Sequence, residues 1–166
     1  MYREMLQKQR ELNLEICHKF GLKVENLIGE YTAALLVEVG ELANETKCFK
    51  FWREDKTTKR DRILEETSDV FHFILSLVIA CKVEDEIMYD FDEIDRREEN
   101  TTKHFLILYN NIALFNMGLN DDRVGLQSVM NAFIKLCHNL GITRQDLREQ
   151  YLKKNEINLK RQEQHY

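Results

Sequence analysis

Two short acidic pairs are the residues of this sequence best suited to chemistry. Glu38 and Glu41 form one pair, and Glu66 and Asp69 form the other. Members of each pair are three positions apart, so on a helix both carboxylates project from one face. Four oxygen donors that converge from two helices suit a hard cation such as Mg²⁺, and suit a metal that prefers thiolate or imidazole much less. The spacing therefore predicts a magnesium site.

The apolar neighbours of these acids indicate which way the carboxylates face. Glu38 falls between Leu35 and Leu42 at helical spacing, and Glu66 falls between Ile63 and Val70. A glutamate on a helix is usually solvated, but a carboxylate within an apolar stripe faces the interior, where it is costly unless paired or bound to a metal. Two such pairs on neighbouring helices favour a metal site over solvated helix faces.

A di-iron centre is the alternative chemistry for carboxylates in a helical bundle. That design needs Glu-x-x-His twice, whereas here only Asp69 and His72 stand at the required spacing. The ligand set favours magnesium, whose recurrent role is to neutralise phosphate charge while a water is oriented for in-line attack on phosphorus.

Length and composition predict one soluble helical domain over residues 1–166. The chain has no proline and six glycines, so long helices with short connections are favoured over strands and tight turns. A net charge of −5 argues against nucleic acid as a partner. The longest apolar run, 71–81, is too short to span a membrane. With no signal peptide at the N-terminus and four isolated cysteines, we expect a cytoplasmic protein with free thiols.

Apolar periodicity predicts an all-α bundle of about six to seven helices. The segment 84–100 is acidic and less regular, and is expected to form a short helix and a loop. Thr143 is the expected N-cap of the last helix, and Asp146 is expected to complete a capping box. The other predicted helices cover 2–19, 30–52, a segment that begins near residue 58, 102–117 and 123–140.

The acidic pairs and their surroundings resemble a known family. The pattern E-x-x-E followed by E-x-x-D is the metal motif of the all-α NTP pyrophosphatase superfamily, which includes the dimeric dUTPases and MazG. The resemblance to the dimeric dUTPase branch extends from Gln9 to Arg161. It rests on four segments, 34–45, 49–52, 69–76 and 151–162.

The resemblance implies a fold, a reaction and a set of site residues. It implies an all-α NTP pyrophosphatase-like bundle completed by homodimerisation, and Mg²⁺-dependent hydrolysis of dUTP, and of dUDP, to dUMP. Glu38, Glu41, Glu66 and Asp69 would hold Mg²⁺, and Glu41 or Glu38 would orient the attacking water. The implied substrate contacts are Gln9 and Asn13 to uracil, Trp52 packed on the base, His72 and Phe73 beside deoxyribose, and Lys154, Asn158 and Arg161 to the sugar and phosphates.

Two other functions remain open at this point. The metal motif is shared across the superfamily, so a house-cleaning (d)NTP pyrophosphatase of broader specificity would carry the same four acids. A regulator from another class would keep the fold, bind a partner protein and use the nucleotide as its switch. Only the residues around the base distinguish the first of these from a dUTPase.

Overall fold

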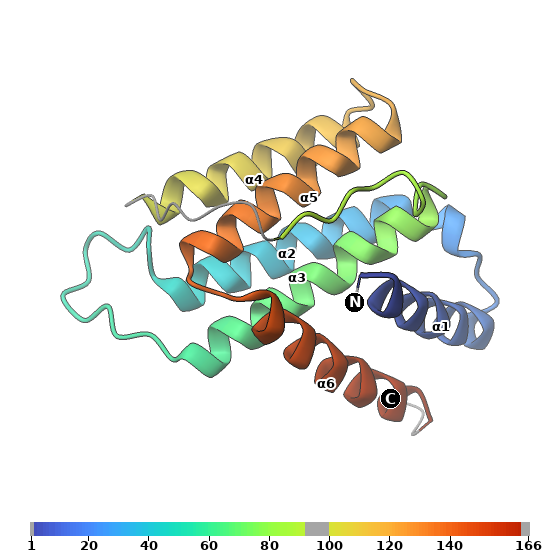
Figure 1. Ribbon diagram of the computed structural model, residues 1–166, viewed down its shortest axis with the longest axis horizontal. Coiled ribbons are helices and arrows are strands. Elements are labelled where there is room, and N and C mark those ends of the chain that lie inside the picture. Colours follow the sequence, from blue (N-terminus) through green and yellow to red (C-terminus); the bar gives the residue numbers. More distant parts are fainter. Residues whose placement is uncertain (1, 92–99, 164–166) are drawn as a thin grey trace.

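The computed structural model of the protein describes residues 2–91 and 100–163 (Figure 1). All regular elements in these residues are helical, which confirms the predicted all-α class. The elements are α1 (Tyr2–Phe20), the short 3-10 helix η1 (Val24–Asn26), α2 (Ile28–Thr46), α3 (Arg60–Ala80), α4 (Thr101–Asn116), α5 (Asp122–Asn139) and α6 (Arg144–Glu163).

Helix α3 is the centre of the bundle. It packs along α2 and also contacts α1, α5 and α6, so α4 and α5 lie on one side of the α2–α3 pair and α1 and α6 on the other (Figure 1). Every residue from Ile74 to Ala80 is buried. A helix that is apolar on all sides belongs inside a bundle, and this position brings side chains of α3 against both neighbouring layers.

The apolar stripes predicted around the acidic pairs form the core between α2 and α3. Leu35, Val39 and Leu42 on α2 are fully buried, as are Val70 and Ile74 on α3. The acids interrupt these stripes, so the same packing that buries the aliphatic side chains carries carboxylates toward the helix–helix contact.

Helix α2 ends at Thr46, and the prediction of helix up to Trp52 was wrong. Lys47 adopts a left-handed backbone conformation with φ 55°, and its N–H donates to the carbonyl of Ala43 at 3.1 Å. Such a residue closes the last helical turn and redirects the chain. A turn follows, in which the N–H of Lys50 donates to the carbonyl of Lys47 at 3.1 Å. The aromatic residues near position 50 therefore lie in a connection rather than on a helix.

Only part of the segment before α4 is described. Residues 84–91 form turns and irregular chain, and 92–99 lie outside the described residues, so the short helix expected within 84–100 stays a prediction. Val83, Ile87 and Phe91 are buried, so this segment packs on the core through apolar side chains. Asn100 then caps α4, its side-chain oxygen accepting from the N–H of Lys103 at 3.0 Å.

The start of α6 carries the predicted capping box. The N–H of Asp146 donates to the Thr143 hydroxyl at 3.1 Å, and the N–H of Thr143 donates to the Asp146 carboxylate at 2.9 Å. Arg60 donates to the same carboxylate at 3.0 Å, which ties the start of α6 to the start of α3. Among the described residues, no helix combines the length and apolar character needed to cross a membrane.

Candidate active site

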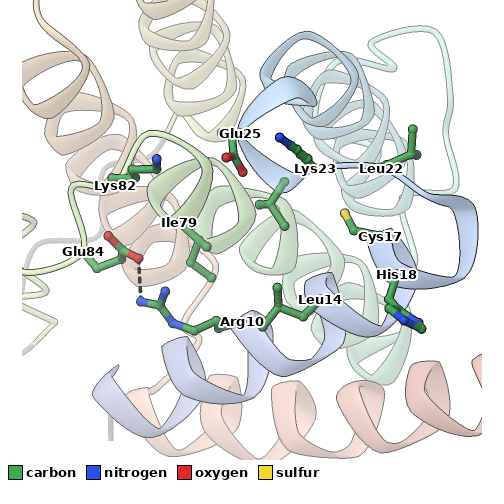
Figure 2. A pocket seen from close by; sticks show the side chains of 11 residues that line it. Arg10, Leu14, Cys17, His18, Leu22, Lys23, Glu25, Ile79, Lys82 and Glu84 are labelled. Atoms are coloured by element: carbon green, nitrogen blue, oxygen red, sulfur yellow. Dashed lines mark hydrogen bonds and ion pairs between the residues drawn. The ribbon is translucent and has the colours of Figure 1, made fainter.

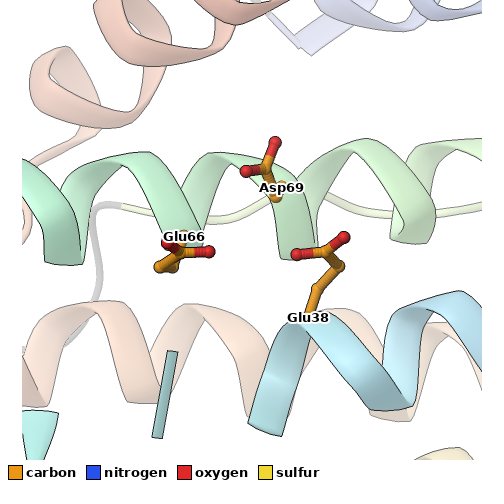
Figure 3. A group of neighbouring side chains, drawn as sticks. All are labelled: Glu38, Glu66 and Asp69. Atoms are coloured by element: carbon orange, nitrogen blue, oxygen red, sulfur yellow. The ribbon is translucent and has the colours of Figure 1, made fainter. Parts of the chain in front are cut away.

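Three of the four predicted metal ligands gather between α2 and α3. Glu38 comes from α2, and Glu66 and Asp69 come from α3 (Figure 3). One carboxylate oxygen from each residue lies within 4.8 Å of those of the other two. Oxygen donors grouped in this way match the ligand chemistry of a hard divalent cation.

Burial and mutual repulsion oppose the ionisation of these acids. The pKa of Glu38 is raised to about 7, first by burial and then by the carboxylates of Asp69, Glu41 and Glu66 in that order of effect. Burial also raises the pKa values of Glu66, which is 4% exposed, and of Asp69. Like charges held close together in a partly buried site favour a bound cation. The residues present therefore fit Mg²⁺.

Two basic side chains neutralise part of the cluster. Lys154 on α6 donates to Asp69 at 2.7 Å, and Arg62 on α3 donates to Glu66 at 2.6 Å. Among the described residues, Glu38 forms no ion pair, so of the three clustered acids it is the one whose charge is compensated least.

Glu41 lies one turn beyond Glu38 on α2 and is exposed. Its charge raises the pKa values of Glu38 and Glu66, so it is close enough to act on the cluster. It does not belong to the group of oxygens that lie within 4.8 Å of one another. Its role as a fourth ligand stays a prediction.

A cavity of about 360 Å³ adjoins the acids and is formed mainly by α1, α3 and α6. Its volume falls in the range of small-molecule sites. Nine of the predicted site residues line it: Gln9, Asn13, Glu38, Asp69, His72, Phe73, Lys154, Asn158 and Arg161. The structure therefore brings the predicted base, sugar, phosphate and metal residues to one place, although they are spread over most of the chain.

A buried hydrogen-bond network forms part of this cavity. Gln9 Nε2 donates to Asn13 Oδ1 at 2.9 Å and to the Ser76 hydroxyl at 3.0 Å. Gln9 Oε1 faces His72 Nδ1 at 2.6 Å, and the Tyr151 hydroxyl is shared between Gln9 Oε1 at 3.0 Å and the Met5 carbonyl at 2.8 Å. The rings of His72 and Tyr151 stack with their centroids 4.2 Å apart. The network joins α1, α3 and α6.

Trp52 is the predicted substrate residue that the structure does not bring to the cavity. It lies in the connection between α2 and α3, where it is 62% exposed and packs edge-on against Phe49 and Phe51. It is not among the lining residues. Its contact with the base stays a prediction.

Three side chains at the site were not predicted, although their spacing indicates them. Ser76 follows His72 by four residues, and Tyr151 precedes Lys154 by three, so each shares a helix face with a predicted residue. Arg62 precedes Glu66 by four, which is ion-pair spacing. Sequence alone could not show that these faces point at one cavity, because that depends on how α1, α3 and α6 pack.

A second and larger cavity lies on the other side of α1 (Figure 2). It has a volume of about 660 Å³ and is lined by Arg10, Leu14, Cys17 and His18 of α1 together with residues of η1 and the end of α3. Arg10 and Glu84 form an ion pair of 2.6 Å within it. The three clustered acids are absent from its lining, so the chemistry belongs to the smaller cavity.

The helical fold and the acids beside the smaller cavity place the chain in the class of all-α nucleotide hydrolases. A comparison with protein families identifies the group more closely, because the family model described as dUTPase matches residues 1–166. The chain belongs to this family, the dimeric all-α dUTPases, and is a dUTP diphosphatase. None of the curated proteins compared with the chain matches it.

Proposed function

We propose that the protein converts dUTP to dUMP and pyrophosphate in a Mg²⁺-dependent reaction, and dUDP to dUMP and phosphate. The observation that carries the proposal is the cluster of Glu38, Glu66 and Asp69, whose oxygens lie within 4.8 Å of one another beside the cavity. Glu41 is proposed as the fourth acid. Bound Mg²⁺ would neutralise phosphate charge and lower the pKa of a coordinated water.

Residues of the chain would orient the attacking water and bind the phosphates and sugar. Glu38 or Glu41 orients the attacking water, and the position of Glu38 in the cavity lining favours Glu38. Lys154, Asn158 and Arg161 recur at i, i+4 and i+7 on one face of α6, where they would bind the phosphates and sugar. Lys154 donates to Asp69, so its own ammonium group lies at the edge of the acid cluster.

The proposed nucleoside subsite occupies the rest of the cavity. The buried network around Gln9 and Asn13 would hold uracil, and the ring of Phe73 would pack beside deoxyribose and leave a ribose 2′-hydroxyl without a partner. Trp52 would cover the base only after its exposed connection moves. We further propose one domain over residues 1–166, a homodimer and a cytoplasmic location.

A nucleotide panel with matched variants tests the reaction. Purified protein is incubated with each (d)NTP and dUDP in Mg²⁺ or EDTA, and products are separated by ion-exchange chromatography. We expect dUTP to give dUMP and pyrophosphate, and EDTA to abolish turnover. Glu38→Gln should lower kcat/KM by at least about 100-fold, since it removes a charge that acts on the developing transition state.

Glu30→Gln is the control, because Glu30 is an exposed residue of the same helix and undergoes the same chemical change. It should keep wild-type activity. Comparable turnover of several bases would move the protein to the broader house-cleaning group. Turnover of dUTP that persists in EDTA would overturn the magnesium proposal. A protein inert toward every nucleotide would leave partner binding as the function to pursue.

A further inference from the structure

Most of the hydrogen-bonding capacity of Gln9 is used inside the protein. A glutamine amide has two N–H donors and two carbonyl lone pairs. Both donors are taken by Asn13 Oδ1 and Ser76, and the carbonyl oxygen is approached by the Tyr151 hydroxyl and His72 Nδ1. Both N–H donors of Gln9 are committed to its neighbours, so Gln9 acts as a positioning residue for Asn13 and His72.

Asn13 and His72 both contact Gln9, and each keeps one buried polar atom without a partner. Asn13 Oδ1 accepts from Gln9 Nε2 at 2.9 Å and shares the Ser76 hydroxyl, at 3.1 Å, with the His72 carbonyl, whereas Asn13 Nδ2 is buried without a partner. His72 Nδ1 faces a carbonyl oxygen and must therefore carry its proton. His72 Nε2, also buried without a partner, is then a bare lone pair. Asn13 offers donors, and His72 offers an acceptor.

We propose that Asn13 Nδ2 and His72 Nε2 together read the imide edge of the base, with His72 Nε2 accepting the N3–H. This rests on the proposed function and changes the expected role of His72, from a neighbour of deoxyribose to the residue that determines base specificity. Both residues are at most 4% exposed and both line the cavity. Two buried polar atoms that lack partners are costly, and a base that pairs with both removes that cost.

Uracil has the complementary pattern. Its N3–H is a donor flanked by two carbonyl oxygens, so it can donate to His72 and accept from Asn13. Cytosine carries a lone pair at N3, which would face the lone pair of His72 Nε2 whichever way the ring is placed. Thymine has the same imide edge as uracil. The pair therefore distinguishes uracil from cytosine and does not distinguish uracil from thymine.

The environment of His72 keeps the acceptor available. Burial, reinforced by the charge of Lys154, lowers the pKa of His72 to about 3, so the ring is neutral at physiological pH. The stack on Tyr151 holds the ring plane, and the short contact with Gln9 holds the tautomer.

Dissociation constants of dUMP, dTMP and dCMP, measured by calorimetry on wild type and His72→Asn, test the proposal. The asparagine amide reaches the Nδ1 position and keeps a donor for Gln9, but it removes the Nε2 acceptor. We expect the preference for dUMP over dCMP to fall about tenfold or more, and the ratio of dUMP to dTMP to stay unchanged. Equal change in both ratios, or in neither, overturns the proposal.

A spectroscopic measurement on the unmodified protein covers the case in which His72→Asn does not fold. In ¹⁵N-histidine-labelled wild type, Nε2 of His72 should appear as an unprotonated nitrogen. Its resonance should shift upfield with dUMP and not with dCMP. A protonated Nε2, or the same shift with both, refutes the assignment. His18→Asn is the control for binding, because His18 lines the other cavity.

The proposed reaction and the proposed base-reading pair can be refuted separately. Selective dUMP binding without dUTP turnover would refute the proposed reaction and leave the base-reading pair intact. Turnover of dUTP with unchanged selectivity in His72→Asn would do the reverse.

Discussion

Glu38 joins the two parts of the site at the scale of a single residue, because it belongs to the acid cluster and also lines the cavity. It is half-buried, and the carboxylates around it oppose its ionisation. The folded chain without metal therefore holds a charge that the unfolded chain would solvate freely. Sites that are preorganised for a cation or a transition state commonly carry such a cost.

This cost predicts that Glu38→Gln stabilises the metal-free protein while it impairs activity. The pKa of Glu38 is raised from 4.5 to about 7 on folding, so the folded state binds its proton more tightly. The contribution of Glu38 to stability consequently falls as pH rises from 4.5 through 7. In EDTA we expect Glu38→Gln to have a higher Tm than wild type at pH 8, with the difference shrinking toward pH 4.5.

Thermal unfolding followed by circular dichroism at pH 5 and pH 8 measures this effect. Glu30→Gln again serves as the control, and its Tm should follow that of wild type at both values. A Tm of Glu38→Gln below wild type at pH 8 in EDTA would mean that the other side chains compensate the Glu38 charge in the free protein.

Among the elements, α3 carries two of the three clustered acids and also polar groups of the cavity, and this spacing could be read from sequence. Glu66, Asp69, His72 and Ser76 succeed one another by three or four residues, so one helical face carries two acids and two polar groups. The place where α2 ends could not be predicted. It depends on the left-handed conformation of Lys47, a residue type that rarely adopts it.

The contact between α4 and α5 supplies a test at the same scale. A Cβ on Gly125 would lie 3.0 Å from Cδ2 and 3.3 Å from Cβ of Phe115, so the two helices approach too closely for a larger residue. We expect Gly125→Ala to lower the free energy of unfolding by about 1 kcal/mol, because the clash outweighs the gain in helix propensity.

Gly29→Ala is the matched control, since a Cβ there has nothing within 4 Å. It lies in the first turn of α2 and should leave stability unchanged or raise it by up to about 1 kcal/mol. Urea unfolding of both variants gives the comparison. Equal effects of the two substitutions would show that Phe115 moves aside without cost.

At the scale of the whole molecule, large apolar side chains remain on the surface of the single chain. Val37 on α2 and Leu106 and Leu114 on α4 are 57%, 57% and 43% exposed. Apolar side chains left uncovered on neighbouring helices favour pairing with a second copy.

Sedimentation at the protein concentration of the activity assay checks this expectation. We expect a species of twice the 19.9 kDa chain mass. An active species that sediments at the mass of one chain would show that the site needs no second copy. Sequence could predict the helical class but not which surfaces meet, because exposed apolar residues become visible only once the helices are packed.

The Tyr151 hydroxyl bonds Gln9 across 142 positions of the chain. During synthesis the acids of α2 and α3 emerge from the ribosome long before α6, and the cavity needs α6 to close it. The nascent protein therefore passes through a stage in which the acids are present but the nucleoside cannot be held. Contacts between such distant parts of a chain also form late in folding, since a large loop must close first. Activity should accordingly appear only when α6 docks, as the last event of synthesis rather than a gradual gain.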